Sequence, residues 1–481
     1  MNIVIPNILP ALPEIFVLSM ACVILVVELF LSEQRRAMSF LLAQATLIGA
    51  AILTAYGMGA GSVMTFERMF VADSLAAVLK LAIYLVTFFV FAYSRAYLSE
   101  RGMFRGEYFV LGLLGLVGMM VMVSASHFLS LYLGLELLSL SLYAMIAFQR
   151  DSVPATEAAM KYFVLGAIAS GMLLYGMSML YGATGTLEIA RLRHELIDLN
   201  PNSMVLIFGL VFVVVGLAFK LGAVPFHMWV PDVYHGAPTA VTLYVGTAPK
   251  IAGAALVIRL LISGLEPLAA SWTDMLTILA ILSMGVGNVI AIAQENLKRM
   301  LAYSSISHMG FFLLGILSAT PNGYGSAVFY VLVYAVMSLG AFGMIVLLSR
   351  AGFEAEKLTD FRGLNQRNPW YAFLMMLLMF SMAGVPPTAG FYAKLLVIQS
   401  VIGAGKLWLA VVAVLLAVIG AYYYLRVVKL MYFDDAEDND PITARPGMRW
   451  MLAMNALALL AIIPWVGMLI ELCRQVIREM A

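Results

Sequence analysis

Long apolar runs dominate the chain, and each is about as long as a membrane-crossing helix. A helix rises about 1.5 Å per residue, so about 20 apolar residues cross the hydrocarbon core of a bilayer. Scanning the sequence for such runs gives about fourteen. They lie near residues 11–31, 38–58, 73–95, 108–124, 127–148, 156–181, 204–235, 239–263, 273–293, 301–318, 326–349, 370–400, 407–431 and 450–473. The pattern predicts an all-α polytopic membrane protein with about 14 transmembrane helices.

The seventh and twelfth runs are too long for one simple crossing, and each contains proline near its middle. The seventh carries the motif GAVP at 222–225, and the twelfth carries AGVPP at 383–387. Proline removes a backbone donor and clashes with the preceding turn. The freed carbonyls are tolerated only inside protein or along a wet cavity. We therefore expect two discontinuous helices with water-accessible half-paths near the midplane, although a simple packing kink is the alternative for either break alone.

The two breaks lie five spans apart in the sequence. An odd number of spans reverses the direction of the chain, so two halves built around these breaks would be inverted relative to each other. Matched interruptions of this kind mark the internal repeats of many transporters. The spacing therefore predicts an inverted repeat.

Composition supports the membrane assignment. Hydrophobic residues make up 63% of the 481 residues and charged residues only 11%, with a mean hydropathy of +0.97. Soluble domains carry roughly 25% charged residues. A net charge of +1 argues against a nucleic-acid partner, which requires a basic face. Cys22 and Cys473 lie in apolar segments and are interpreted as buried small side chains.

The distribution of Lys and Arg among the loops predicts the orientation. Loops after odd-numbered spans are rich in these residues, whereas loops after even-numbered spans hold few of them. The positive-inside rule then places the odd-numbered loops in the cytoplasm and both termini outside. The first apolar run has no basic region before it and is interpreted as a retained span. The acidic residues between 434 and 440 are interpreted as a solvated loop.

Five ionisable residues lie deep inside the apolar runs, where a charge costs several kcal/mol and by default indicates function. They are Glu136 in the fifth run, Lys220 just before the first break, Lys250 in the eighth run, His308 in the tenth run and Lys394 after the second break. Glu136 has no basic residue within reach along its own helix, so its partner must come from another span. The alternatives are a structural ion pair for Glu136 and a hydrogen-bonded core histidine for His308.

These groups have the chemistry of proton carriers. An apolar environment favours the neutral form of a lysine and a nearby carboxylate favours the charged form, so a lysine between them exchanges protons near neutral pH. Histidine titrates there without help. Charges about 4–8 Å apart interact by roughly 2–4 kcal/mol at an effective dielectric constant near 20. A change of charge at one end of the series would therefore propagate along a polar axis.

Further candidates flank this axis. His227 and His235, with Asp232 between them, lie around the second half of the seventh run and would line an exit path or cap a short half-helix. Lys161, at the start of the sixth run, would snorkel to the surface or interact with Glu136. His127 and Lys80 complete the set.

Four stretches carry a resemblance to a known family. They are EAAMKYF (157–163), PFHMWVPDVYHGAPT (225–239), NLKRMLAYSSISHMGF (296–311) and GVPPTAGFYAKL (384–395). Together they resemble the antiporter-like membrane subunits of respiratory NADH–quinone oxidoreductase (complex I), and most closely the subunit N branch of that family. The resemblance covers essentially the whole chain.

The resemblance implies a fourteen-helix fold with two inverted five-helix repeats and discontinuous helices 7 and 12. On this basis we expect N-terminal helices 1–3 at 1–107, a first repeat at 108–263, a second repeat at 264–432 and a C-terminal helix at 433–481. The resemblance also implies that Glu136, Lys220, Lys250, His308 and Lys394 are the proton-transfer residues of helices 5, 7, 8, 10 and 12.

The function implied by the resemblance is proton translocation in the membrane arm of the oxidoreductase. NAD, FMN, iron–sulfur clusters and quinone are expected in partner subunits, and no cofactor or metal is expected in this chain. The expected partners are other membrane-arm subunits, including sister antiporter-like subunits, and the lipid of a bacterial inner membrane, with both termini periplasmic. The alternatives are a subunit of a multi-chain sodium/proton antiporter, a passive scaffold and a stand-alone substrate transporter.

Overall fold

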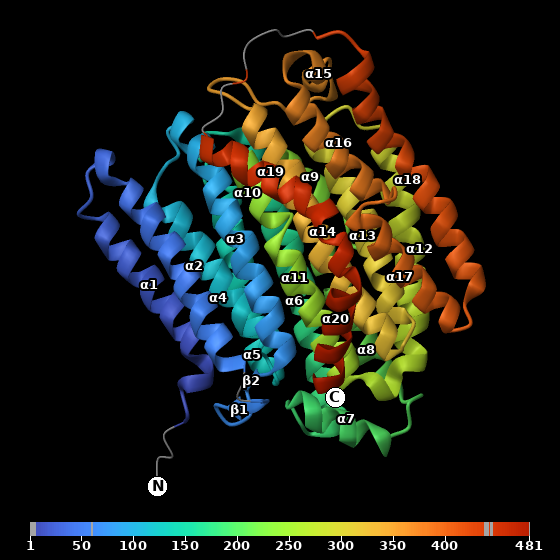
Figure 1. Cartoon of the computed structure of the whole chain (residues 1–481). Coiled ribbons are helices and arrows are strands. Elements are labelled where there is room, and N and C mark those ends of the chain that lie inside the picture. Colours follow the sequence, from blue (N-terminus) through green and yellow to red (C-terminus); the bar gives the residue numbers. More distant parts are fainter. Residues whose placement is uncertain (1–5, 59–60, 437–441, 443–445, 481) are drawn as a thin grey trace.

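Helices running roughly side by side between two polar ends form almost the whole molecule (Figure 1). The computed structural model describes residues 6–58, 61–436, 442 and 446–480. Within these residues, twelve stretches are long and apolar enough to cross a membrane. They are α1 (Leu12–Glu28, with the short turn from Leu9), α2 (Ala37–Gly57), α3 (Ser74–Glu100), α4 (Gly106–Val123), α5 (Phe128–Ile146), α6 (Val153–Thr184), α8 (Met204–Leu221), the series α10 (Thr239–Val245), α11 (Ala248–Val257) and a π-helix (Ile258–Gly264), then α12 (Ala269–Ile292), α13 (Leu297–Leu317), α14 (Pro321–Leu348) and α18 (Leu407–Phe433).

Two further pairs of helices complete the predicted spans. Helices α16 (Pro369–Ala383) and α17 (Ala389–Gly403) are each too short to cross alone and lie within the twelfth predicted run. Helices α19 (Pro446–Ala461) and α20 (Val466–Met480) are bent by 47° relative to each other. Counting each pair as one span accounts for every apolar run that the sequence predicted, which confirms the fold class.

Both predicted helix breaks are present. Helix α8 ends at Leu221 and is followed by Gly222 at φ 75°, after which α9 begins (Trp229–Gly236). Helix α16 ends before Gly384 at φ 86°, and α17 follows. Glycine closes both half-helices because only it adopts the left-handed conformation without a steric penalty.

A third interruption was missed by the sequence analysis. Helix α10 ends at Val245 and α11 begins at Ala248, so the eighth span is also divided. Its C-terminal part continues as the π-helix Ile258–Gly264. Short π segments occur frequently at functional sites because they disturb the regular backbone ladder.

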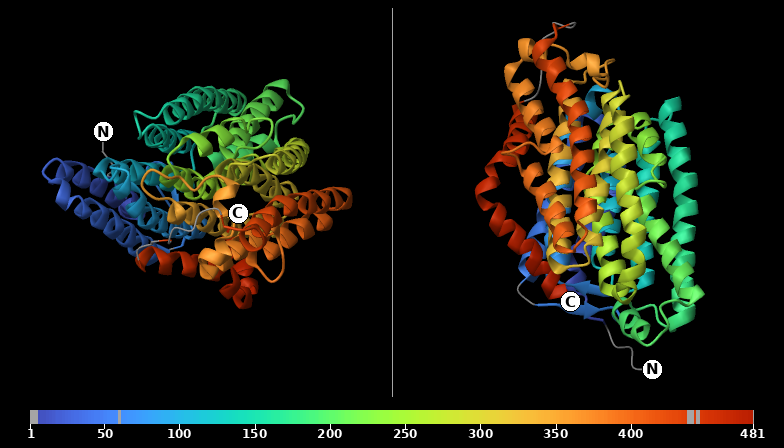
Figure 2. Two further views of the ribbon diagram at one scale, coloured as in Figure 1. Left: turned by 90° about the horizontal axis from the view of Figure 1, so that it is seen from above. Right: turned by 90° about the vertical axis from the view of Figure 1, so that its right-hand side faces the viewer.

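The centre of the bundle consists of the eighth, tenth and eleventh spans. Every residue in the apolar window of α13 is buried, as are 94% for the series starting with α10 and 83% for α14, whereas α1 and α18 bury only 33%. Seen from above, the early helices α1–α3 and the late helix α18 lie towards opposite sides of this core (Figure 2). A helix that is buried on all sides is surrounded by other helices and not by lipid.

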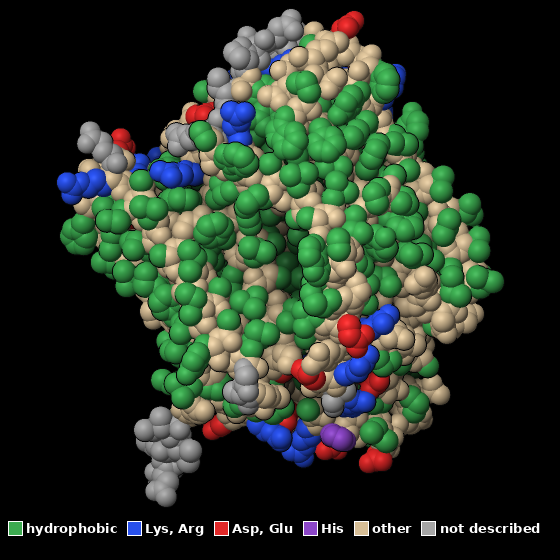
Figure 3. All heavy atoms as spheres, in the orientation of Figure 1, with side chains coloured by type: hydrophobic (Ala, Val, Ile, Leu, Met, Phe, Trp, Pro, Cys, Tyr) green, Lys and Arg blue, Asp and Glu red, His purple; other side chains and the backbone are tan. Residues whose placement is uncertain are grey.

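Apolar side chains cover the middle of the surface and charged ones gather near its two ends (Figure 3). The start of α1 and the end of α20 lie at one end, together with the hairpin β1 (Val63–Thr65) and β2 (Phe70–Ala72) and with α7 (Ile189–Ile197) (Figure 1). The short helix α15 (Leu364–Arg367) lies at the other end. The two termini therefore share one side, as an even number of crossings requires.

The structure corrects one detail of the sequence interpretation and leaves another untested. Cys473 is buried as expected, but Cys22 is exposed on α1, because the apolar outer face of this helix is not covered by the rest of the chain. Part of the acidic stretch, Glu437, Asp438 and Asp440, lies outside the described residues, as does Arg445.

Candidate functional site

The first buried lysine lies between α5 and α8. Lys220, in the last turn of α8, donates a hydrogen bond to the hydroxyl of Ser139 on α5 at 2.7 Å. Glu136, one turn earlier on α5, is close enough to Lys220 to interact with it electrostatically. One carboxylate oxygen of Glu136 is buried and has no hydrogen-bond partner among the described residues. The two predicted residues therefore lie together, with Ser139 as the direct contact of the ammonium.

Lys250 occupies the first helix break. Its Nζ donates to the backbone oxygen of Leu221 at 2.8 Å and lies 5.4 Å from the centre of the Trp229 ring. The side chain comes from α11 and is only 2% exposed. Carbonyls at a helix C-terminus carry partial negative charge, so the break provides a site that favours a cation.

Lys220 and Lys250 line the same small cavity. Its volume is about 20 Å³, and its other walls include Ser139, Tyr162 and Trp229. This is about the space that one ordered water needs. The two lysines therefore share the wall of a space large enough for about one water.

The second break is organised in the same way by a different helix. Lys394, on α17, donates to the backbone oxygens of Met382 and Ala383 at 2.8 and 2.9 Å. These oxygens belong to the C-terminal turn of α16. The ammonium lies 5.0 Å from the centre of the Phe311 ring on α13. At each of the two breaks, buried carbonyls at the end of a half-helix thus accept hydrogen bonds from one buried lysine.

His308 lies on the central helix α13, between two tyrosine hydroxyls. Its Nδ1 is 2.7 Å from the hydroxyl of Tyr330, and its Nε2 is 3.1 Å from that of Tyr424. The side chain is 2% exposed and close enough to Lys394 to interact electrostatically. Tyr424 also contacts the hydroxyl of Ser304. Both ring nitrogens are therefore hydrogen-bonded, which allows the ring to accept a proton on one side and release one on the other.

Hydroxyl groups connect the eighth span to the surroundings of His308. The backbone oxygen of Gly246, at the interruption between α10 and α11, accepts hydrogen bonds from Tyr334 at 3.4 Å and Ser338 at 3.1 Å. Tyr334 also donates to Ser305 at 2.8 Å, and its ring centre lies 5.2 Å from that of His308. Tyr334 thus links the interruption of the eighth span to the surroundings of His308.

The further candidates lie away from this row. Lys161 forms ion pairs at 2.8 Å with both Glu157 and Asp232, and its side chain is 45% exposed. Asp232 also pairs with Arg299 at 2.9 Å. Of the two alternatives for Lys161, the structure shows the one in which the side chain reaches the surface, and its ion-pair partners are Glu157 and Asp232, not Glu136.

The two histidines lie at opposite ends of α9. His227 precedes the helix, and its buried Nδ1 has no hydrogen-bond partner among the described residues. His235 lies in the last turn of α9 and is exposed. His127 caps the N-terminus of α5 by accepting from the backbone N–H of Leu129 at 3.2 Å, which is a structural role.

Two buried ion pairs lie at the end of the bundle that holds the termini. Lys80 pairs with Glu14. Arg259, in the π-helix, makes a bidentate contact with Asp73 at 2.7 Å for each bond. Arg259 also donates to the backbone oxygen of Val123 at 3.1 Å. These pairs join α1, α3, α4 and the eighth span, and the bidentate geometry is the strong form of such a contact.

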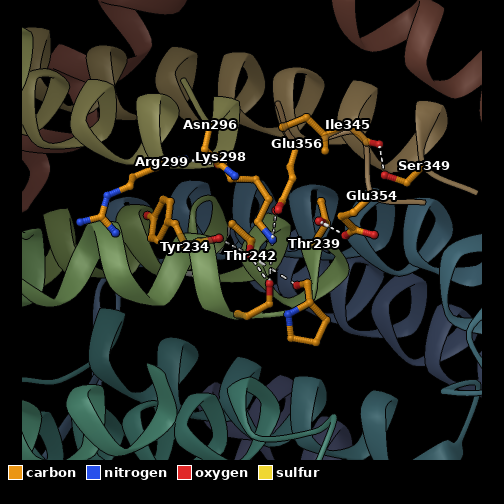
Figure 4. A network of polar contacts seen from close by, with 12 residues as sticks. Tyr234, Thr239, Thr242, Asn296, Lys298, Arg299, Ile345, Ser349, Glu354 and Glu356 are labelled. Atoms are coloured by element: carbon orange, nitrogen blue, oxygen red, sulfur yellow. Dashed lines mark hydrogen bonds and ion pairs between the residues drawn. The ribbon is translucent and has the colours of Figure 1, made fainter. Parts of the chain in front are cut away.

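The sequence analysis missed two parts of this polar network. The tyrosines around His308 come from α14 and α18, and no local pattern marks them among the 22 tyrosines of the chain. Lys298 was not among the candidates, but it is buried at 3% exposure and donates to the backbone oxygen of Ala237 at 3.0 Å (Figure 4). Its position beside a helix start in the sequence gave no sign that the loop after α14 folds over it.

Within the described residues, no group of three or more His, Cys, Asp or Glu side chains is placed to hold a metal ion.

The sequence was compared with protein families and with known proteins. A family model described as NADH:quinone oxidoreductase/Mrp antiporter, transmembrane, matches residues 125–420. The NADH-quinone oxidoreductase subunit N of Thioalkalivibrio sulfidiphilus is 60% identical, with 98% of each chain covered. The subunit N of Thiobacillus denitrificans is 62% identical, with 94% of each chain covered.

Solved structures share the fold. A chain of respiratory complex I from Thermus thermophilus matches with a TM-score of 0.82 and 28% identity, covering 96% of this chain and 99% of that one. A chain of the Mrp complex from Dietzia sp. matches with a TM-score of 0.83 and 20% identity, covering 98% and 97%, which supports the fold alone. The near full-length relatives and the matching family model show that the chain belongs to the NADH-quinone oxidoreductase subunit N family.

Proposed function

We propose that this chain is a proton-translocating subunit in the membrane arm of an NADH–quinone oxidoreductase. Its neighbours are other membrane-arm subunits, including antiporter-like ones, as in the complexes that hold its structural relatives. NADH oxidation and quinone reduction take place in partner subunits that carry NAD, FMN, iron–sulfur clusters and quinone. This chain converts the free energy of that electron transfer into proton movement.

The observation that carries the proposal is the row of buried ionisable groups beside two helix breaks. Glu136 and Lys220 form its first member, Lys250 the second, and His308 with Lys394 the last. A scaffold needs neither buried, hydrogen-bonded lysines nor interrupted helices at bilayer depth, since both are costly there. A substrate transporter needs half-helix N-termini directed at its ligand, whereas here lysines contact half-helix C-termini.

The proposed mechanism is electrostatic. When Glu136 is ionised it favours the protonated form of Lys220, and when that charge is withdrawn Lys220 releases its proton towards Lys250 through their common cavity. A proton arriving on Lys250 is stabilised by the carbonyl of Leu221. The tyrosine and serine hydroxyls around His308 then carry protons between Lys394 and the first half. The inverted repeat and its boundaries at 108–263 and 264–432 belong to the same proposal.

The sodium/proton antiporter alternative shares the fold and the family model. The relatives above 50% identity over nearly the full chain carry the name of the oxidoreductase subunit, which favours the first assignment. The proposal includes both termini on the periplasmic side of a bacterial inner membrane, which the distribution of Lys and Arg among the loops supports.

The test is NADH-driven acidification of inverted membrane vesicles that carry Lys220→Ala. Assembly of the complex and NADH oxidation are measured in the same membranes, and Lys429→Ala, at an exposed position on α18, is the matched control. We expect an assembled complex in which pumping and coupled turnover fall sharply, while the control behaves as wild type. Normal pumping by an assembled Lys220→Ala complex would contradict the proposal and favour a scaffold.

A further inference from the structure

A water-accessible pocket opens at the end of the bundle opposite the termini, outside the row of predicted residues. Its volume is about 520 Å³. It is lined by the exposed ends of α3, α5 and α9 and by the loop after α14, and its ionisable side chains are Glu100, Arg101, His235, Lys298, Glu354 and Glu356. Apolar packing does not explain a hollow lined by this many charges.

Lys298 lies at the buried base of the pocket. Its ammonium is 3.4 Å from a carboxylate oxygen of Glu356 and 3.0 Å from the backbone oxygen of Ala237, directly after the half-helix α9 (Figure 4). Its side chain is 3% exposed, whereas the Glu356 side chain is 26% exposed. Lys298 is therefore a buried group that contacts both a pocket carboxylate and the backbone of the interior.

Fixed negative charge surrounds this lysine. Glu354 accepts hydrogen bonds from Tyr97 at 2.6 Å and from Thr239, and pairs with Arg101. Burial by itself raises the pKa of the Glu354 carboxyl, but the charge of Lys298 and these hydrogen bonds outweigh burial, so the pKa lies below its ordinary value. Glu354 is consequently ionised at neutral pH and favours cations in the pocket.

One face of α13 leads inward from Lys298. Ser305 follows two turns later and His308 one turn after that, so the three residues lie along the same side of a helix over about 15 Å. Hydroxyls border this face: Thr242 donates to the backbone oxygen of Tyr234 at 2.9 Å and lies 3.4 Å from that of Ala237.

The hydroxyl of Tyr234, on α9, lies near Ser305 of this face. It is buried without a hydrogen-bond partner among the described residues and is close enough to Ser305 and Tyr334 to interact with both. A buried hydroxyl without a partner is costly, and a role in proton transfer would explain why it is retained here. Tyr334 already contacts Ser305 and the surroundings of His308.

We propose that this pocket is the aqueous entrance of a proton path in which Lys298 takes up the proton and passes it along α13, by way of Tyr234, Ser305 and Tyr334, to His308. The inference rests on the proposed function and adds the point at which the proton is taken up. Protons enter from water at the end of the bundle that holds α15, and Lys298 is a proton-relay residue and not a fixed partner of Glu356.

The test replaces the lysine by a thiol that accepts either of two charged groups. Lys298→Cys is made with Cys22→Ser and Cys473→Ala, and membranes containing the whole complex are treated with aminoethyl methanethiosulfonate or with its trimethylammonium analogue. Each reagent forms a mixed disulfide with the introduced thiol and releases a sulfinate. The first installs a protonatable amine and the second a permanent charge that cannot carry a proton. Lys357→Cys, at an exposed position in the loop after α14 that also holds Glu356, is the matched control.

We expect Lys298→Cys to lower NADH-driven proton pumping by about tenfold or more, as for removal of a proton-transferring group. The amine should restore most of it and the trimethylammonium group should not, while the control pumps normally throughout. Restoration by both groups would show that only a fixed charge is needed. Wild-type pumping by Lys298→Cys, failure of the reagents to reach the thiol, or modification without any restoration would equally overturn the proposal.

Lys220→Ala in the same assay separates the two proposals. If Lys220→Ala stops pumping while Lys298→Cys leaves it unchanged, only the entrance is wrong. If both variants pump at the wild-type rate, the proposed function itself fails.

Discussion

The ammonium of Lys250 lies 2.8 Å from the backbone oxygen of Leu221, the last residue of α8. Lys394 makes the same kind of contact with the last carbonyls of α16. At each break, a helix C-terminus that would otherwise leave unpaired carbonyls in an apolar interior is satisfied by a lysine. The contact couples backbone and proton chemistry, because a lysine that gives up its charge also loses most of its attraction for the carbonyl.

The first prediction concerns this contact. Lys250→Met keeps the length and apolar character of the side chain but removes the cation from the Leu221 carbonyl. We expect NADH-driven pumping to fall severalfold or more while the complex still assembles, and Lys250→Arg to retain part of the activity. Quenching of a pH-sensitive dye in inverted vesicles measures the pumping. Equal activity of the Met variant and the wild type would show that the contact is only structural.

The second prediction concerns the backbone at the first break. Gly222 has φ 75°, and a Cβ there would lie 2.6 Å from the Val230 side chain. Gly222→Ala should therefore destabilise the subunit by roughly 1–2 kcal/mol, the cost of a left-handed conformation, or by more if Val230 cannot move. Gly171→Ala is the matched control, since it lies within α6 with no atom within 4 Å of a Cβ. Thermal dissociation of the solubilised complex compares them, and equal midpoints would contradict this account.

The third prediction separates two adjacent tyrosines on α18. Tyr424 is hydrogen-bonded to His308, whereas Tyr423 donates to Asn288 at 3.0 Å. Both are buried, so each Tyr→Phe change removes one buried hydroxyl. We expect Tyr424→Phe to slow proton pumping clearly more than Tyr423→Phe, because only the former contacts the imidazole. Similar rates for the two variants would remove the hydroxyl of Tyr424 from the path.

The fourth prediction concerns the buried pair of Asp73 and Arg259. Asp73→Asn leaves the guanidinium buried without its countercharge, which costs about 3–5 kcal/mol. Arg68→Gln breaks a pair with Glu188 in which the arginine is 66% exposed, and should change stability by less than about 1 kcal/mol. Thermal dissociation of the complex measures both changes. A small effect of Asp73→Asn would show that Arg259 finds other partners.

The same pair predicts a pH dependence. Burial alone raises the pKa of Asp73, but Arg259 and the N–H of Ala76 outweigh burial and hold it below the ordinary value of 3.8. Folding thus favours the carboxylate, so its stabilisation is fully present above the unfolded-state pKa and is lost as the pH falls through the lower folded-state pKa. Wild type should lose this stability below about pH 4, whereas Asp73→Asn should lack that part of the acid dependence.

The sequence by itself determined the spans, the two glycine–proline breaks and the deep positions of Glu136, Lys220, Lys250, His308 and Lys394. These features depend on local chemistry: apolar length sets a span, proline and glycine interrupt it, and a charge within an apolar run is visible in the sequence. The domain boundaries and the inverted repeat remain predictions.

Only the tertiary structure decided which atoms meet. That Lys220 contacts Ser139, that Lys161 pairs with Asp232, and that a loop buries Lys298 all depend on helices distant in the sequence packing side by side. The interruption at Gly246 was missed although Pro249 stands in the first turn of α11, because a proline near the start of a short apolar run does not by itself show where the preceding helix ends. Helix packing sets these contacts through side-chain shape across interfaces, and a one-dimensional pattern does not contain that information.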